Sequence, residues 1–325
     1  MPTSDLSLAG VTVVIPCYNY AHFLPQAIES CLNQDHSPME VLVVDDESTD
    51  DSVAVANGYG EKVRCVRQKN QGVGVARNTG MREAAHEFVI FLDADDMLAP
   101  GAVRRFLKTY LDEAVEPGVL AGSALMVDRD TVPLDRHPHP PLFAGVRQIL
   151  LEEAIMFTPF APTVLAKKDF LLSLGGFETD DRTYRGSEDK SMWIKVAASG
   201  RPLLLLGEVV VHYRVHGSSM SHNGLRQIAS SHAILQRAQN DFGGQLSGAA
   251  WNRAWAFSYF QAAIIHSEIK REKDALMFLV RSFMLAPVIR HETLRSRYGS
   301  LFRVKRFLKI IRDGLQSRLG LAPAV

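Results

Sequence analysis

The chain has 325 residues, 46% of them hydrophobic and 22% charged, with 36 Lys and Arg against 36 Asp and Glu. This composition excludes a disordered chain or a coiled coil, and the length suits one large α/β domain with an appendage or two domains. The zero formal net charge argues against a protein that binds nucleic acid over its whole surface, because phosphate binding requires an excess of Lys and Arg.

Short apolar runs alternate with longer amphipathic segments over the first hundred residues. Strands are predicted at Val11–Pro16, Val41–Val44, Val63–Val66 and Phe88–Leu92. Helices are predicted at His22–Gln34, Asp50–Gly58, Val73–Ala85 and Ala102–Asp112. This alternation predicts a Rossmann-like α/β fold, with a mostly parallel central sheet flanked by helices. Ligands of such sheets bind beyond the carboxyl ends of the strands, so functional residues are expected just after each strand.

The pattern becomes irregular from residue 119 and helical beyond residue 222. Further strands or extended segments are predicted at Val119–Val127, Pro162–Ala166, Leu203–Leu206 and Val209–Tyr213, with a helix at Glu188–Ala198. Helices are then predicted at Leu225–Asp241, Trp251–Arg271, Asp274–Leu285 and Leu301–Leu315. We therefore divide the chain into an α/β domain, residues 1–222, and a C-terminal helical appendage, residues 223–325.

The three cysteines and the N-terminus indicate the compartment. The chain has three cysteines, Cys17, Cys31 and Cys65, an odd number that cannot all pair within the chain. They also lack metal-ligand spacing, so reduced thiols are favoured. The first ten residues lack a secretion signal, and no window approaches 18 uninterrupted apolar residues. We expect a cytoplasmic protein that does not span a membrane.

Two acidic clusters follow predicted strands, one at Asp45–Asp50 and one at Asp93–Asp96. Close carboxylates repel each other by about 1 to 4 kcal/mol per pair unless a cation or hydrogen-bond donors compensate. Oxygen ligands of this kind suit Mg²⁺ or Mn²⁺, whose shell a substrate phosphate completes. The alternative is a pair of solvated turns in which Ser48, Thr49 or Asp50 caps a helix.

Two further segments have side chains that suit a nucleotide. Tyr18, after the first strand, can stack on a base, and Asn19 can bond the base edge or fix the loop. The glycine-containing turn at residues 72–80 runs into a helix whose N-terminus, with Arg77, can favour a phosphate. The alternative for Arg77 is a surface cation. Neither segment is the dinucleotide fingerprint, which needs GxGxxG directly after the first strand.

Taken in order, these motifs resemble family-2 glycosyltransferases of the GT-A fold. The matching segments are residues 13–19, 43–50, 72–78, 91–96, 175–177, 187–189 and 213–216. The resemblance implies an inverting transfer of one sugar from a nucleotide-diphosphate sugar, with a UDP-sugar favoured, to a hydroxyl of a glycan or lipid-linked acceptor. Residues 1–222 would form the catalytic domain. The transmembrane helices and Gln-x-x-Arg-Trp signature of processive members are missing, which favours addition of a single sugar.

The resemblance also implies roles for particular residues. Tyr18 would stack on the base, Asp46 would read it with Asp45 nearby, and Asp93 and Asp95 would be the DXD motif that holds ribose and the metal. The predicted nucleotide-sugar-binding residues are Pro16, Tyr18, Asn19, Asp45, Asp46, Arg77, Asp93 and Arg214. The predicted ligands of Mn²⁺ or Mg²⁺ are Asp93, Asp95 and His216.

The general base implied by the resemblance is Asp189, with Glu188 as the adjacent alternative. Neighbouring helical residues point about 100° apart, so only one of them can face the site. Removal of a proton from a sugar hydroxyl typically contributes 10²–10⁴-fold to the rate. Arg214 and His216 share one face of an extended segment, and a purely structural role is the alternative for both.

Residues 290–318 are strongly basic, with nine Lys and Arg against two acids. Apolar residues recur there at helical spacing, as in an interfacial helix that docks peripherally on the anionic inner face of the cell membrane. A terminal helix packed on residues 251–265 and a homodimer contact are the alternatives. For the whole chain, the competing functions are a nucleotide-sugar-binding scaffold that has lost catalysis and a nucleotidyltransferase.

Overall fold

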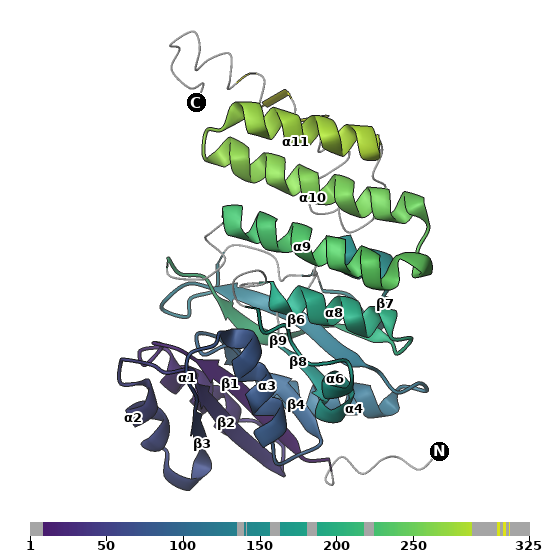
Figure 1. Ribbon diagram of the computed structural model, residues 1–325. Coiled ribbons are helices and arrows are strands. Elements are labelled where there is room, and N and C mark those ends of the chain that lie inside the picture. The colour runs from purple at the N-terminus through teal and green to yellow at the C-terminus, as the bar shows by residue number, and fades with distance from the viewer. Residues whose placement is uncertain are drawn as a thin grey trace. The chain divides into compact units, whose positions relative to one another are not determined.

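The computed structural model describes residues 9–134, 140, 142–156, 163–180, 187–217 and 224–287, together with residues 304, 305, 308, 309 and 312. The chain divides into two compact units, residues 1–220 and residues 221–325 (Figure 1). Each unit is considered by itself.

Within its described residues, the first unit contains a nine-stranded sheet and its flanking helices. Its strands are β1 (Val11–Cys17), β2 (Met39–Asp45), β3 (Arg64–Arg67), β4 (Phe88–Phe91), β5 (Met97–Leu98), β6 (Val119–Val127), β7 (Val146–Ile149), β8 (Val164–Lys167) and β9 (Leu203–Arg214). Its helices are α1 (Leu24–Leu32), α2 (Ser52–Asn57), α3 (Val73–Glu83), α4 (Ala102–Asp112), α5 (Leu151–Met156), α6 (Lys168–Ser173) and α8 (Glu188–Ala198), with a 3₁₀ turn at Gly60–Lys62.

The strand order is β3-β2-β1-β4-β8-β6-β9-β5, with β7 paired to β9. β1 lies parallel to β2 and to β4, and β2 lies parallel to β3. β8 is antiparallel to both β4 and β6, whereas β6 and β9 form a long parallel pair. β5 and β7 are also antiparallel to β9, so parallel and antiparallel ladders are equal in number among the described residues, but the parallel ladders contain most of the paired residues. The predicted α/β class is confirmed.

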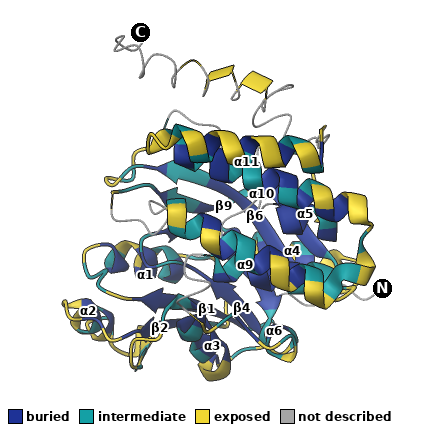
Figure 2. Ribbon diagram, turned by 45° about the horizontal axis from the view of Figure 1, so that its top comes forward, coloured by how far each residue is buried: buried dark blue, intermediate teal, exposed yellow. Residues whose placement is uncertain are grey.

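Alternate residues of β1 face opposite layers, as the two-residue period of a strand requires. Val13 and Ile15 pack into a core with buried side chains of α1, α2 and α4. Val14 points to the other side, where it lies against Gly80 of α3. Figure 2 shows the strands buried between these helices. Burial on both faces explains why β1 and β2 read as continuous Val and Ile runs rather than alternating ones.

The element bounds show where the sequence pattern is sufficient. α4, β6 and α8 begin and end at the predicted residues. β9 is one strand where two were predicted, with the predicted break at residues 207 and 208. Gly207 instead lies inside the strand, where a Cβ would come 2.0 Å from the Phe143 carbonyl oxygen. β5, β7, α5 and α6, each of two to six residues, were not predicted. Such short elements carry too few residues to show a period.

The second unit contains α9 (Gly224–Phe242), α10 (Gly248–Glu268) and α11 (Glu272–Leu285), with a 3₁₀ turn at Gly243–Gln245. α10 packs against both α9 and α11 (Figure 1). Among the described residues, no helix combines the length and hydropathy needed to cross a membrane. The predicted helix at residues 301–315 lies outside the described residues except at positions 304, 305, 308, 309 and 312.

The close contact of α3 with β1 predicts that Gly80→Ala destabilises the first unit. A Cβ at residue 80 would lie 2.2 Å from Val14 Cγ1, and the buried valine has little room to move. We expect a loss of about 1–3 kcal/mol, measured as a lower melting temperature. Gly217→Ala is the matched control, because a Cβ there meets nothing within 4 Å. Adding Val14→Ala should recover part of the loss, and equal melting temperatures for both single variants would contradict the packing argument.

Candidate active site

The loop after β1 is tied to the loop after β2 through Asn19. Its side-chain oxygen accepts hydrogen bonds from the Thr49 amide at 2.7 Å and the Asp50 amide at 3.3 Å. Asn19 has a φ of 60°, a conformation that Asn tolerates better than most residues. These contacts fit the predicted alternative in which Asn19 fixes the loop. Tyr18, by contrast, is 42% exposed and is free to stack on a ligand.

Asp46 holds the segment that leads into α3. Its carboxylate accepts hydrogen bonds from Gln68 Nε2 at 2.7 Å, the Gln71 amide at 3.1 Å and the Gly72 amide at 2.8 Å. Three donors therefore compensate the buried charge without a cation. A carboxylate has about four acceptor positions, so these bonds leave room for one more donor.

Asp45 and Pro16 are part of the sheet edge itself. Asp45 ends β2, is buried, and lies 3.3 Å from Arg67 Nε, while its oxygens also accept from the Ser48 amide. Pro16 is buried in β1 opposite Val44 of β2. Both residues shape the edge from within, and neither side chain projects from it in the way that Tyr18 does.

Arg77 is buried between two parts of the site. Its Nη1 donates to Glu188 at 2.6 Å and its Nη2 to Asp93 at 2.8 Å, with only 2% of the side chain exposed. The guanidinium also lies 5.4 Å from the ring centre of Phe177. Burial alone would lower the pKa of Arg77, but the carboxylates of Asp93, Glu188 and Asp189 outweigh it and raise the pKa. Arg77 is therefore an internal bridge rather than a surface cation.

The glycine-containing segment at the start of α3 allows this close approach. A Cβ on Gly74 would lie 2.3 Å from the carbonyl oxygen of Glu178, so only glycine fits there. Asn78 donates to the Phe177 carbonyl at 2.9 Å and accepts from the Phe177 amide at 2.8 Å. The structure thus uses residues 72–80 to dock α3 onto the segment before α8, a role that the sequence analysis missed. The sequence signal that could have revealed this role was Arg followed by Asn in a helix that contains glycines.

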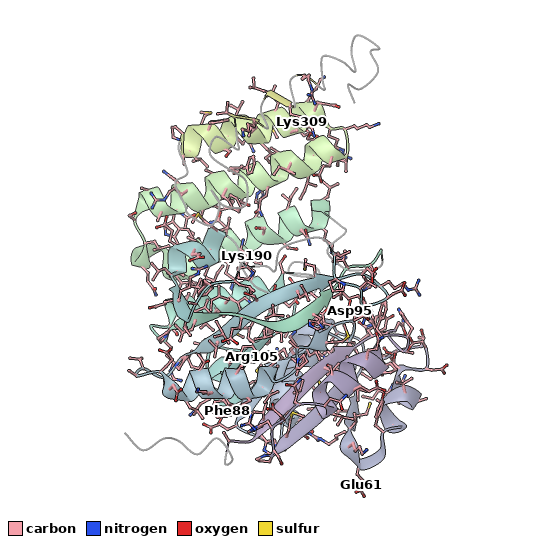
Figure 3. The ribbon with its side chains drawn as sticks, turned by 180° about the vertical axis from the view of Figure 1, so that it is seen from behind. Glu61, Phe88, Asp95, Arg105, Lys190 and Lys309 are labelled. Atoms are coloured by element: carbon pink, nitrogen blue, oxygen red, sulfur yellow. The ribbon has the colours of Figure 1, made fainter. Side chains whose placement is uncertain are left out.

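The carboxylates after β4 converge as a metal site requires. Asp93, Asp95 and Asp96 each offer an oxygen, and these atoms lie within 4.8 Å of one another. Asp96 is buried, and one of its oxygens accepts from the Arg214 amide at 2.8 Å while the other has no partner. His216 Nε2 lies 2.9 Å from Asp95 (labelled in Figure 3).

The protonation of these carboxylates supports the same interpretation. Burial, followed by the charge of Asp93, raises the pKa of Asp95. Burial, followed by the charges of Asp95 and Asp93, raises the pKa of Asp96 well above its usual range. Uncompensated negative charge and an orphaned carboxylate oxygen are what a divalent cation with oxygen ligands would satisfy. The residues present therefore fit Mg²⁺ or Mn²⁺.

Glu188 and Asp189, at the start of α8, have different surroundings. Glu188 is buried and ion-paired with Arg77. Asp189 is half-buried and accepts a hydrogen bond from the Lys190 amide at 2.7 Å. Burial, followed by the charge of Glu188, raises the pKa of Asp189 to about 6. Asp189 is therefore the more available proton acceptor of the two.

Arg214 is buried, and its guanidinium lies 4.6 Å from the Phe23 ring centre. Its side-chain N–H groups donate to the backbone oxygens of Asp95 and Arg129 and to the side chains of Thr131 and Gln26. These partners brace the loop that contains the acidic cluster. These contacts fit the structural alternative for Arg214, and its direct contact with a diphosphate stays a prediction.

Comparison with known proteins identifies the family. Residues 12–163 match the family model of Glycosyl transferase family 2. Residues 12–163 therefore form a domain of this family. A glycosyltransferase of Nostoc sp. that carries no further assignment is 32% identical over 216 residues, covering 64% of this chain and 66% of that protein. Chondroitin synthase of Escherichia coli is 37% identical over 103 residues, covering 31% of this chain and 15% of that protein.

A solved structure shows the same fold. The crystal structure of S. aureus TarS 1–349 in complex with UDP-GlcNAc matches with a TM-score of 0.64 at 16% identity, covering 97% of this chain and 93% of that chain. The chain thus has the fold of the TarS structure, and its residues 12–163 carry the family-2 match. It spans slightly less than two thirds of the Nostoc protein and a small part of chondroitin synthase.

The buried bridge predicts a pH-dependent loss of stability in Arg77→Met. The charge of Arg77 lowers the raised pKa of Asp189, so without the guanidinium that pKa rises further and the folded state holds a proton that the unfolded state releases. Stability then falls as the pH rises. We expect Arg77→Met to lose little stability near about pH 5 and about 3–5 kcal/mol near about pH 8. The melting temperature at each pH measures this loss.

The double variant Arg77→Met/Glu188→Gln should recover part of this loss at the higher pH, because the unpaired charge is gone. An Arg77→Met loss that is the same at both pH values, or no recovery in the double variant, would contradict the bridge.

The acidic cluster predicts stabilisation by Mn²⁺ or Mg²⁺. A ligand at about 100 times its dissociation constant stabilises the folded state by about 2.7 kcal/mol. The shift in melting temperature should be larger at about pH 8 than at about pH 5, because protonation of the raised-pKa carboxyls competes with the metal. Asp95→Asn should abolish the shift, whereas Asp112→Asn, at an exposed position on α4, should leave it unchanged. An undiminished shift in Asp95→Asn would rule out this cluster.

Proposed function

We propose that this protein is an inverting, metal-dependent glycosyltransferase that moves one sugar from a nucleotide-diphosphate sugar to a hydroxyl acceptor. The observation that carries the proposal is the single buried bridge of Arg77, which joins Asp93 of the acidic cluster to Glu188, next to Asp189. One end of this arrangement suits a diphosphate with its metal, and the other suits a proton acceptor. A sugar transfer needs both groups at a fixed separation.

The donor end is proposed to take a nucleotide sugar, with a UDP-sugar favoured. The exposed ring of Tyr18 supports base stacking, and the free acceptor position of Asp46 supports one hydrogen bond from the base. Asn19, Asp45 and Pro16 shape this end of the site by fixing the loops around it. The UDP-GlcNAc complex of TarS, a protein of the same fold, supports the donor class.

Asp93, Asp95 and Asp96 are proposed to hold the metal, with His216 either as a further ligand or as the group that orients Asp95. When bound, Mn²⁺ or Mg²⁺ would neutralise charge on the diphosphate as it departs. Arg214 supports this function from outside by bracing the loop. Because its donors already have protein partners, it is proposed as a positioning residue rather than as a phosphate ligand.

Asp189 is proposed as the general base. The acceptor oxygen forms a bond to the anomeric carbon while the bond from that carbon to the phosphate oxygen breaks, and the leaving nucleoside diphosphate takes the electron pair. The proton of the acceptor hydroxyl passes to Asp189. A single displacement of this kind inverts the anomeric configuration. A pKa of about 6 keeps Asp189 ionised at neutral pH yet basic enough to accept the proton.

The acceptor is proposed to be a glycan or a lipid-linked sugar. The competing functions are a scaffold that binds the donor without transfer and a nucleotidyltransferase, which would join the nucleotide of a nucleoside triphosphate to a sugar phosphate and release inorganic pyrophosphate. The family membership supports sugar transfer over both. The products distinguish them directly, because only sugar transfer or donor hydrolysis releases a nucleoside diphosphate.

The test is a panel of nucleotide sugars with Mn²⁺ or Mg²⁺, monitored by release of nucleoside diphosphate and transfer to acceptor sugars. We expect one donor class to react and Asp189→Asn to lower transfer by about 10²–10⁴-fold while donor affinity stays near that of the wild type. Wild-type transfer should decline as the pH falls through about 6, because the base must be unprotonated.

Two outcomes would contradict the assignment. Transfer by Asp189→Asn at the wild-type rate would remove it as the base, and Asp169→Asn, an acid at the first turn of α6, controls for a general effect of charge. Donor binding without diphosphate release from any of the panel would favour the scaffold function instead.

A further inference from the structure

Four large apolar side chains lie exposed along one face of α11. Leu276 is 36% exposed, Met277 41%, Val280 44% and Met284 78%. Positions 276, 280 and 284 are one helical turn apart, so these side chains form one continuous stripe. Figure 2 shows exposed residues along the length of α11. We call these four residues the α11 stripe.

The opposite face of α11 is packed, so the stripe does not result from a loosely held helix. Ala275, Leu279 and Ser282 are buried, and Ser282 Oγ donates to the Ala256 carbonyl of α10 at 2.5 Å. These contacts fix the rotation of α11 about its axis. The stripe is thus presented outward by a helix whose core face is already satisfied, and exposed apolar patches of this kind mark interaction surfaces.

Charge is divided unequally between the two units. Residues 221–325 contain 16 Lys and Arg against six Asp and Glu, for a net charge of +10, whereas residues 1–220 contain 20 against 30, for −10. Lys305, Lys309 (labelled in Figure 3) and Arg312 are exposed, as are Val304 at 40% and Leu308 at 61%. The second unit therefore combines exposed apolar side chains with a large positive charge.

These two properties select the partner. A second copy facing the same stripe would bring two units of charge +10 together, which is unfavourable. A nucleic acid would neutralise the cations but leave the apolar stripe without a partner. An anionic phospholipid surface satisfies both, because the acyl boundary accepts apolar side chains and the headgroups attract Lys and Arg.

We propose that the α11 stripe, together with the cations of residues 221–325, docks this protein on the surface of an anionic phospholipid bilayer. This inference does not rest on the proposed transfer activity, because it depends only on residues of the second unit. It assigns a function to α11, a helix that contributes no residue to the sugar-transfer site described above.

The test is co-sedimentation of the full chain with vesicles of phosphatidylcholine, with and without phosphatidylglycerol. We expect binding to the anionic vesicles that weakens as salt is raised, and about tenfold or greater loss of binding in Val280→Glu/Met284→Glu. Leu150→Glu is the matched control, because Leu150 is 61% exposed but belongs to the first unit. Unchanged melting temperatures would show that both variants fold.

The proposal is overturned if the wild type does not bind anionic vesicles or if Val280→Glu/Met284→Glu binds as well as the wild type. It is also overturned if these substitutions dissociate an oligomer in size-exclusion chromatography while vesicle binding is absent, since a second copy would then cover the stripe. Retention of a polynucleotide but not of vesicles would likewise contradict it. Donor hydrolysis by soluble enzyme should be unaffected by the substitutions, so the two proposals fail separately.

Discussion

The guanidinium of Arg77 is the one group on which the rest of the site depends. It is buried between Asp93, after β4, and Glu188, at the start of α8, which are separated by 95 positions in the chain. A buried ion pair tolerates loss of neither partner, because the remaining charge would have lost its hydration without compensation. The bridge therefore fixes the acidic cluster relative to the helix that contains Asp189. The close packing of Gly74 and Asn78 brings Arg77 to this position.

The charges around the bridge do not balance. Asp93, Glu188 and Asp189 lie around the buried guanidinium of Arg77, while Asp95 and Asp96 lie near that of Arg214, so five carboxylates face two guanidinium groups. Burial first, and then the neighbouring carboxylates, raise the pKa values of Asp95, Asp96 and Asp189. A carboxyl with a raised pKa in the folded state binds protons that the unfolded state releases, so its contribution to stability falls as the pH rises through that pKa. The fold carries this cost at neutral pH at the place where a divalent cation would remove it. Function and stability are thus opposed at this edge of the sheet.

Sequence was sufficient for features that repeat or that follow strands, and insufficient for features set by distant contacts. Continuous apolar runs rich in Val and Ile located β1, β2 and β4, and the acidic segments that follow β2 and β4 lie at the same edge of the sheet. The role of Arg77 as a buried bridge was not predicted, because its partner Glu188 lies 111 positions away in the chain. Helical periodicity indicates only which face of a helix is buried, not which residue it contacts. The partners of Arg214 were likewise not predicted, because they come from three separate segments, at residues 26, 95 and 129–131, that only folding brings together.

The most direct test of this account is the sugar-transfer rate of Arg77→Lys, measured beside the affinity for a nucleoside diphosphate with Mn²⁺. Lysine keeps the charge but has a single ammonium in place of the two-pronged guanidinium, so it cannot hold Asp93 and Glu188 in the same geometry. If the bridge sets the spacing between the donor and the base, transfer should fall by about 10²-fold with affinity little changed, since small misplacements are that costly. Wild-type transfer by a folded Arg77→Lys variant would show that the spacing does not depend on the bridge and would contradict the account.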